Sequence, residues 1–195
     1  TGEMDRNEAN PFYHFSHTVD QRVWWKYPSR KDPLGNRQTV LTATPDMMRT
    51  IKERYYVPNN SVLVVTGDVK ASDVFAQADA LYTDWPRAED PFVKFPLVQH
   101  PPIPYTSVVT VQQPVEAPFV SFTWHGPSTV GDNVDLTYAA DLLSFALQKP
   151  ASKYQQDLVD SGACVYAAAP SWYTQANTGP ISIQAQAAPD KLDGC

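Results

Sequence analysis

The sequence predicts an α+β protein. Apolar residues recur at helical spacing in several segments, for example over residues 133–149. Runs rich in valine, threonine and aromatic residues, such as residues 118–124, are typical of strands. Both patterns occur on each side of a proline-rich stretch, so we expect helices and strands in both halves of the chain.

The first 37 residues predict two helices and a loop. Residues 1–9 are typical of a helix that Asn10-Pro11 ends, because the residue before a proline avoids the α region. Residues 12–27 carry apolar side chains at three-to-four spacing and predict a second helix. Residues 28–37 are dense in turn-forming residues and predict a loop.

A third helix begins at Thr44-Pro45-Asp46, which combines a hydroxyl cap, a proline in the first turn and a carboxylate near the positive helix end. It must end before Pro58. Its expected inner stripe is Met47, Met48, Ile51 and Tyr55.

Residues 62–65 are apolar without alternation and predict a strand covered on both faces. Gly67-Asp68 closes that strand with a turn. A further helix follows and ends at Trp85-Pro86. Its expected stripe is Val74, Phe75, Ala78, Leu81 and Tyr82.

Residues 86–105 hold six prolines and no periodicity, and we place the linker at 89–104. Beyond it, residues 107–113 and 118–124 predict strands, and residues 133–149 predict a helix. The side chains expected to face inward from that helix are Leu136, Ala140, Leu143 and Leu147.

Residues 152–161 predict the last helix, and Gly162 suits a left-handed cap at its end. Strands are expected at residues 165–168 and 181–187. Two cysteines, Cys164 and Cys195, form neither a disulfide framework nor a metal knuckle, and we interpret Cys164 as a buried thiol.

The composition excludes several classes of protein. The chain has 15 basic and 21 acidic residues with no basic patch, which argues against nucleic-acid binding. No apolar run approaches the roughly 20 residues that a membrane span needs. Thr1 at the start and Asp193-Gly194-Cys195 at the end suggest a fragment of a longer protein.

Four motifs, in this order and spacing, resemble the insulinase/pitrilysin family of inverted-motif zinc metallopeptidases, the H-x-x-E-H type. The resemblance covers nearly the whole chain. The motifs are Gly2-Glu3-Met4-Asp5-Arg6-Asn7-Glu8, Pro33-Leu34-Gly35-Asn36 through Thr44, the run Tyr55–Val69, and Ser152–Leu158 with Gly162.

The resemblance implies lobes in which helices pack on a mainly antiparallel sheet. Residues 1–88 would close the first, catalytic lobe, residues 89–104 would be the linker, and residues 105–195 would open the second, non-catalytic lobe. It also implies a Zn²⁺ cofactor, with Glu3 as one metal ligand of a His₂Glu site. A peptide would be the substrate and metal-activated water the nucleophile.

Other candidate ligands are weaker. Asp5 and Glu8 are rivals to Glu3, but on a helix they point in different directions from it, and the family register favours Glu3. His14 and His17 form an H-x-x-H without a third ligand in the same element.

Further residues have structural interpretations. We interpret His125 as a surface or packing residue and Asp68 as a turn residue rather than an active-site carboxylate. For Trp24-Trp25 and Trp172-Tyr173, core packing is favoured over a peptide-binding patch.

The sequence contains no H-x-x-E-H, so no catalytic residue is expected in this segment and the isolated chain should be inactive. The alternative is a non-catalytic partner or peptide-binding subunit of the same fold. Either a homologous partner subunit or a homodimer is compatible with the resemblance. The family's single-chain bacterial members favour a bacterial periplasm or envelope.

Overall fold

A computed structural model describes residues 1–28, 31–131, 133–162 and 165–192. The described residues form two compact units. The first unit combines residues 1–37 with residues 99–195, and the second consists of residues 38–98. Segments far apart in the sequence therefore share the first unit. Cys164 and Cys195 lie outside the described residues, so the expectation for the Cys164 thiol stays a prediction.

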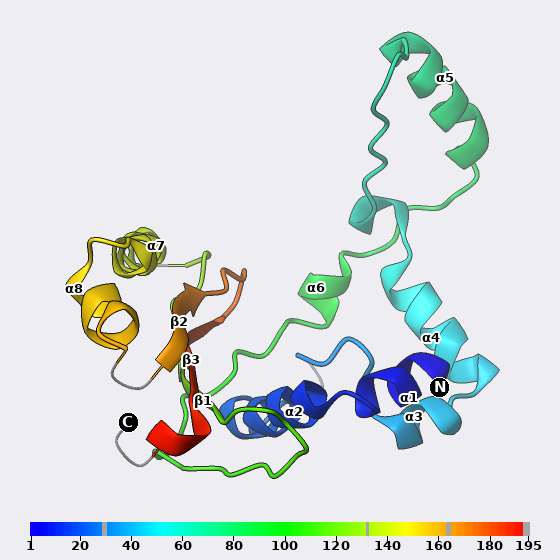
Figure 1. Cartoon of the computed structure of the whole chain (residues 1–195). Helices are drawn as coiled ribbons and strands as arrows, with labels where there is room; N and C mark the ends of the chain where they lie inside the picture. The colour runs from blue at the N-terminus through cyan, green and yellow to red at the C-terminus, as the bar shows by residue number, and fades with distance from the viewer. Residues whose placement is uncertain (29–30, 132, 163–164, 193–195) are drawn as a thin grey trace. The chain divides into compact units, whose positions relative to one another are not determined.

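The first unit is built on a three-stranded antiparallel sheet with the order β1-β3-β2. Strand β1 pairs with β3 from Phe119↔Gln186 to His125↔Pro180, and β2 pairs with β3 with an irregularity near Val165. Its elements, coloured by position in Figure 1, are α1 (Gly2–Glu8), α2 (Pro11–Val23), β1 (Phe119–His125), α7 (Asp135–Gln148), α8 (Lys153–Gln155), the π-helix η3 (Gln156–Asp160), β2 (Val165–Trp172), β3 (Pro180–Ala187) and the 3₁₀ turn η4 (Pro189–Lys191).

Helix α2 packs against one face of β1. The rings of Phe12 and Phe15 both meet the ring of Phe119 edge-on, with centroids 5.4 and 5.1 Å apart. Along β1, half-buried residues alternate with exposed ones, as expected for a strand with one covered face. This contact joins the start of the chain to the sheet of its second half, and it positions α2 on the sheet.

The second unit, residues 38–98, is described throughout and contains no β-strand. Its elements are α3 (Arg37–Leu41, which begins at the last residue of the first unit), α4 (Pro45–Tyr55), the 3₁₀ turn η2 (Pro58–Asn60), α5 (Ala71–Tyr82) and α6 (Pro91–Lys94). An extended segment, residues 61–66, runs between η2 and the Gly67 turn and lies along α5 (Figure 1).

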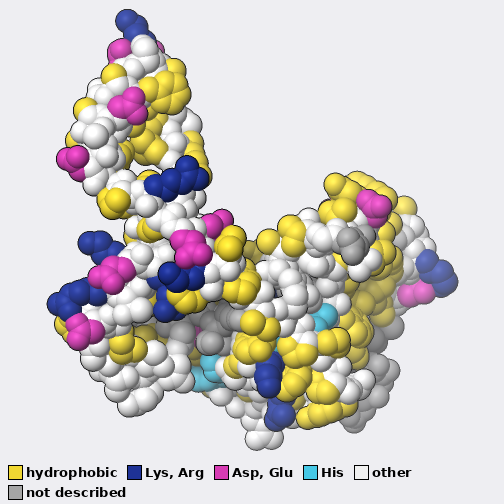
Figure 2. Space-filling model, turned by 180° about the vertical axis from the view of Figure 1, so that it is seen from behind, with side chains coloured by type: hydrophobic (Ala, Val, Ile, Leu, Met, Phe, Trp, Pro, Cys, Tyr) yellow, Lys and Arg dark blue, Asp and Glu magenta, His cyan; other side chains and the backbone are white. Residues whose placement is uncertain are grey.

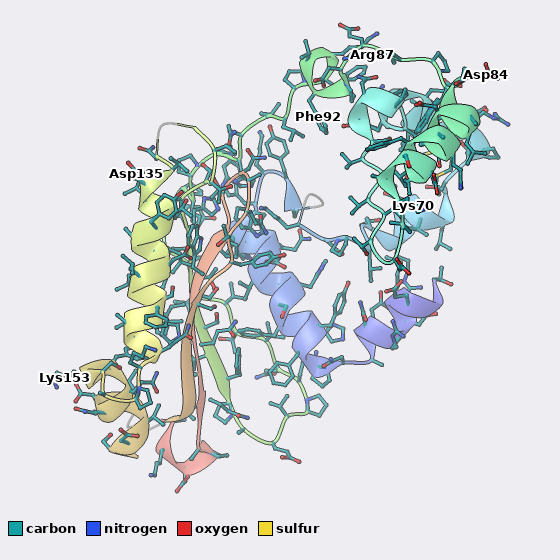
Figure 3. The ribbon with its side chains drawn as sticks, turned by 90° about the horizontal axis from the view of Figure 1, so that it is seen from above. Lys70, Asp84, Arg87, Phe92, Asp135 and Lys153 are labelled. Atoms are coloured by element: carbon teal, nitrogen blue, oxygen red, sulfur yellow. The ribbon has the colours of Figure 1, made fainter. Side chains whose placement is uncertain are left out.

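The local start and stop signals are confirmed. Thr44 caps α4 through its Oγ1, which accepts from the Met47 N–H at 3.3 Å. Ser152 caps α8 in the same way, at 3.1 Å from the Gln155 N–H. Gly162 adopts a left-handed φ of 62° after η3. Helices α7 and α8 begin near the labelled residues Asp135 and Lys153 in Figure 3.

Two strand predictions are wrong in this structure. Residues 62–65 and 107–113 have no regular secondary structure, and neither segment forms a ladder with another described residue. A β-strand is defined by its hydrogen bonds to a neighbouring strand. The strand propensity of these residues does not determine whether such a neighbour is present. The side chains of residues 62–65 are also exposed rather than covered.

Several helix predictions need smaller corrections. The predicted 12–27 helix ends at Val23, where Trp24 leaves the helical region with φ −104° and ψ 38°. The predicted 152–161 helix is a three-residue α-helix, α8, followed directly by the π-helix η3. The linker contains the short helix α6, which Asp90 caps at the Phe92 N–H. A five-residue helix, α3, was not predicted.

The inward faces of three helices are also corrected. In α5, Phe75, Leu81 and Tyr82 are exposed, whereas Val74 and Ala78 are half-buried. In α4, Met47, Met48 and Ile51 are exposed. In α7, Leu136 and Leu143 are exposed, whereas Ala140 is buried as predicted. The more covered stripe of α7 is Thr137, Ala140, Ser144 and Leu147. Spacing predicts that a helix has an apolar stripe, but the neighbours decide which part of it is covered.

No helix in the described part of the chain combines the length and the apolar character required to cross a membrane.

Candidate metal-ligand site

The candidate ligand Glu3 lies on α1, a seven-residue helix. Met4 anchors this helix, since only 5% of its surface is exposed. The side chain of Glu3 is 64% exposed, and Arg6 Nη2 lies 3.7 Å from Glu3 Oε1. An exposed pair at this distance contributes little to stability. The Glu3 carboxylate is therefore available to a further partner.

The rivals Asp5 and Glu8 are held by one arginine. Arg37 Nη2 donates to Asp5 Oδ1 at 2.6 Å and to Glu8 Oε2 at 2.8 Å, and Arg37 Nε donates to Glu8 Oε1 at 3.2 Å. The bonds to Glu8 and then to Asp5 raise the pKa of Arg37. At about 100° per residue, Asp5 and Glu8 lie on a different side of the helix from Glu3. The structure thus gives both rivals a structural role.

Of the three ligands in the predicted His₂Glu site, the described residues include only the candidate Glu3. Among them, no three His, Cys, Asp or Glu side chains lie together in a way that could hold a metal ion. A zinc site needs about four ligands, three of them from protein in catalytic sites. These residues on their own do not complete a site, and the assignment of Glu3 stays a prediction.

The His14 and His17 pair of α2 has other partners. His14 Nε2 lies 2.7 Å from the backbone oxygen of Glu8 and so joins α2 to the end of α1. His17 stacks on Tyr13, with centroids 5.5 Å apart, and its Nδ1 lies 3.6 Å from Asp32 Oδ2. These contacts fasten α1, α2 and the following loop together.

A cluster of aromatic and histidine rings lies where α2 ends. Trp24 is 2% exposed, and the imidazole of His125 stacks on it. His100 meets both rings edge-on, at 5.4 Å from Trp24 and 5.3 Å from His125. The ammonium of Lys31 lies over the Trp24 ring, 4.2 Å from its centroid. We call these four residues the Trp24 cluster.

Burial lowers the pKa of His125, and the electrostatic effects of His100 and Lys31 act in the same direction. A backbone bond opposes it, since His125 Nε2 lies 2.8 Å from the oxygen of Val23. The Trp24 cluster is therefore a packing site, as predicted for Trp24 and His125. Its dependence on His100, far away in the sequence, was not predicted. Trp25, in contrast, is 42% exposed.

The remaining candidates are turn or surface residues. Asp68 follows Gly67, whose φ of 134° makes the turn, and the Val69 N–H bonds the Gly67 oxygen at 3.0 Å. Tyr173 is 67% exposed, which differs from the core packing predicted for it. Asp68 agrees with its interpretation as a turn residue.

Comparison with known proteins gives the family. Residues 42–195 match the family model described as the peptidase M16 inactive domain. A curated relative, the probable zinc protease PqqL of Escherichia coli K12, is 37% identical over 46 residues, which is 24% of this chain and 5% of that protein. Glu3 lies before the matched residues, so the family model does not test it.

Solved structures share the fold. A peptidase M16 inactive domain from Pseudomonas fluorescens has a TM-score of 0.72 at 17% identity, over 96% of this chain and 44% of that one. The periplasmic protease PqqL of E. coli has a TM-score of 0.64 at 15% identity, over 99% of this chain and 22% of that one. A protease from Helicobacter pylori has a TM-score of 0.64 at 20% identity, over 81% and 38%.

The described chain thus spans less than half the length of these relatives. The mixture of helices with a small antiparallel sheet confirms the predicted α+β class. With the match over residues 42–195, the resemblance seen in the sequence is confirmed: the chain belongs to the peptidase M16 family.

Proposed function

We propose that this chain is part of a zinc-dependent metalloendopeptidase that hydrolyses peptides or small unfolded proteins. In it, residues 105–195 form a non-catalytic wall of the peptide-binding chamber. The observation that carries the proposal is the match of residues 42–195 to an M16 domain of the inactive type. Membership of a peptidase family supports the reaction class, and the inactive type of the domain supports the non-catalytic role.

Glu3 is the residue that we assign to the metal. Its carboxylate is exposed, whereas Asp5 and Glu8 on the same helix are bound to Arg37. In a His₂Glu site, bound zinc supplies an acidified water for attack on the peptide bond. The two histidines and the general base would come from an H-x-x-E-H outside this sequence. Arg37 would position α1 and thereby the Glu3 carboxylate.

The division into lobes belongs to the same proposal. Residues 1–88 would close a catalytic lobe, and residues 105–195 would open a second lobe that lines a peptide-binding chamber. A homologous subunit or a second copy could complete the assembly. The periplasm of a bacterium is the proposed location, supported by the relative PqqL, which is described as a periplasmic protease.

The inactive type of the matched domain also favours a second candidate, a non-catalytic partner or peptide-binding subunit. The peptidase and the partner subunit are distinguished by the presence or absence of an H-x-x-E-H motif in the longer polypeptide. An H-x-x-E-H upstream of Thr1 supports the peptidase, and a sequence without it supports the partner subunit.

Metal analysis tests the proposal. The full polypeptide should bind one zinc per chain and cleave an unfolded peptide, and a chelator should abolish the cleavage. The 195-residue chain should bind less than stoichiometric zinc and cleave nothing, because it provides one carboxylate ligand. Stoichiometric zinc on the 195-residue chain, or a full polypeptide that cleaves without metal, would contradict it.

A further inference from the structure

The Trp24 cluster joins four segments of the first compact unit. Trp24 follows the last residue of α2, and Lys31 lies in the loop after it. His100 belongs to the linker predicted at 89–104, and His125 is the last residue of β1. In the proposed division into lobes, these segments come from the first lobe, the linker and the second lobe. The cluster is therefore a point at which three parts of the chain are fastened together.

The ring of His100 fastens the downstream end of the linker. Four rings meet it edge-on, with centroids 5.3 to 6.3 Å away: Trp24, Trp25, Tyr27 and His125. A hydrogen bond lies beside this contact, because Trp25 Nε1 donates to the Pro102 oxygen at 3.3 Å. Figure 2 shows histidine side chains, in cyan, that border hydrophobic side chains on the face that it presents. The linker end is thus held by rings from other segments.

The ammonium of Lys31 fastens the loop between β2 and β3 to the same cluster. It lies over the Trp24 ring and donates to Oε1 of Gln175 and, at 2.8 Å, to the backbone oxygen of Thr178. The backbone oxygen of Gln175 in turn accepts from the Thr129 N–H at 3.2 Å. The β2–β3 loop is therefore connected both to the end of α2 and to the segment that follows β1.

No carboxylate faces His125 among the described residues. The titratable groups that face it are Lys31, from the loop after α2, and His100, from the linker. Helix α2 presents the Val23 carbonyl, 2.8 Å from His125 Nε2, and β3 presents Pro180, which carries no titratable group. Burial lowers the pKa of His125, and the electrostatic effects of His100 and Lys31 act in the same direction. The surroundings of this ring therefore favour its neutral form.

One carboxylate of α2, Asp20, acts on Lys31. Burial lowers the pKa of Lys31 and raises that of Asp20, and the attraction between the two groups opposes both shifts. The Nε2 atom of His100 is buried, and no described residue forms a hydrogen bond with it. The cluster thus holds one cation with an acidic partner, and a second positive charge would have no such partner among the described residues.

We propose that the Trp24 cluster is an acid-sensitive clasp, which protonation of His125 opens. The closed clasp holds residues 99–102 and the β2–β3 loop against the end of α2. An imidazolium at His125 repels the Lys31 ammonium in a half-buried site, and opening the clasp returns both charges to water. The sheet and α2 stay folded when the clasp is open. The inference depends on neither zinc nor peptide hydrolysis.

Hydrogen exchange of the full polypeptide at about pH 8 and about pH 5 tests the inference, with each rate compared with that of an unstructured chain at the same pH. Two amides report on the clasp: Gly126 N–H bonds the Gly179 oxygen at 2.7 Å, and Thr129 N–H bonds the Gln175 oxygen at 3.2 Å. Their protection should fall about 3- to 10-fold at the acidic pH. The ladder at residues 120–123 should stay protected at least about 100-fold.

Two results of this measurement would overturn the proposal. Equal protection of Gly126 and Thr129 at the two pH values would show that acid does not open the clasp. Loss of protection at residues 120–123 as well would show that the whole sheet unfolds.

A pair of variants identifies the group responsible. His125→Phe keeps a ring on Trp24 and removes the titrating group, so the protection of Gly126 and Thr129 should be the same at both pH values. His14→Gln, whose histidine contacts the Glu8 oxygen on α1, is the matched control and should keep the acid-dependent fall. A fall that persists in His125→Phe would overturn the proposal. If His125→Phe does not fold, His125→Gln provides the same test, because its amide can still donate to the Val23 oxygen.

Discussion

The imidazole of His125 stacks on the indole of Trp24, with ring centroids 4.6 Å apart and ring planes 12° from parallel. These two residues are about a hundred positions apart in the sequence, and their contact joins the end of α2 to the end of β1. Their environment makes the stability of the folded chain depend on pH.

Stability should fall as the medium becomes acidic. Burial holds the pKa of His125 below its ordinary value of 6.5, and the electrostatic effects of His100 and Lys31 lower it further. Between the lowered pKa and 6.5 the unfolded chain binds more protons than the folded chain, so the free energy of unfolding decreases as the pH falls through this window. Above the window His125 is neutral in both states and contributes no pH dependence.

Thermal denaturation between about pH 8 and about pH 5 measures this effect. His125→Phe keeps an aromatic ring on Trp24 but removes the titrating group, so it should flatten the curve in this window. His14→Gln is the control for removing a histidine, because it leaves His125 and the rest of the Trp24 cluster in place. An unaltered pH dependence in His125→Phe would show that another group is responsible.

The buried indole should dominate the stability of the first unit. Trp24→Ala is expected to cost about 3–5 kcal/mol, because it removes a large buried side chain and the support for two histidine rings. Trp25→Ala is the control, since Trp25 is 42% exposed and its Nε1 donates to the Pro102 oxygen at 3.3 Å. It should cost less than about 1.5 kcal/mol. Chemical denaturation of both variants checks the difference, and equal costs would contradict the packing described here.

Gly162 should resist substitution for a purely conformational reason. Its φ is 62°, and a Cβ at this position would meet no atom within 4 Å. Gly162→Ala should therefore cost about 1–2 kcal/mol from the left-handed backbone alone. Gly2→Ala is the matched control, because Gly2 also has open space but lies in the right-handed helix α1. That variant should be neutral or stabilising by up to about 1 kcal/mol. Equal unfolding free energies would argue against the strain.

Features set by local chemistry could be predicted from the sequence. Thr44 and Ser152 cap helices because their hydroxyls reach a backbone N–H three residues on. Gly162 ends a helical segment because a glycine tolerates a positive φ. The family resemblance depends on such local motifs, and the match to the M16 inactive domain confirms it.

Features that depend on distant neighbours could not be predicted. Spacing alone placed Leu143 inward, but the sheet covers a stripe through Ala140, so Leu143 is exposed. The apolar run at residues 62–65 predicted a covered strand, and within the described residues it has no ladder partner. The apolar pattern of a segment predicts that it is buried, but it does not identify the distant segment that covers it.

The candidate site shows the same division. The sequence placed Glu3, Asp5 and Glu8 on one helix, and α1 confirms that placement. The bonds from Arg37 to Asp5 and Glu8 were not predicted, because about thirty residues of helix and loop separate the partners and no local pattern connects them. Whether Glu3 binds metal stays a prediction.

Zinc content of the Glu3→Gln full polypeptide is the measurement that tests the central claim most directly. The neutral amide is a poor ligand, so this variant should lose both bound zinc and peptide cleavage. Glu8→Gln, whose glutamate is bound by Arg37, is the control on the same helix and should retain its zinc. Normal zinc content in a folded Glu3→Gln polypeptide would contradict the assignment and remove Glu3 from the metal site.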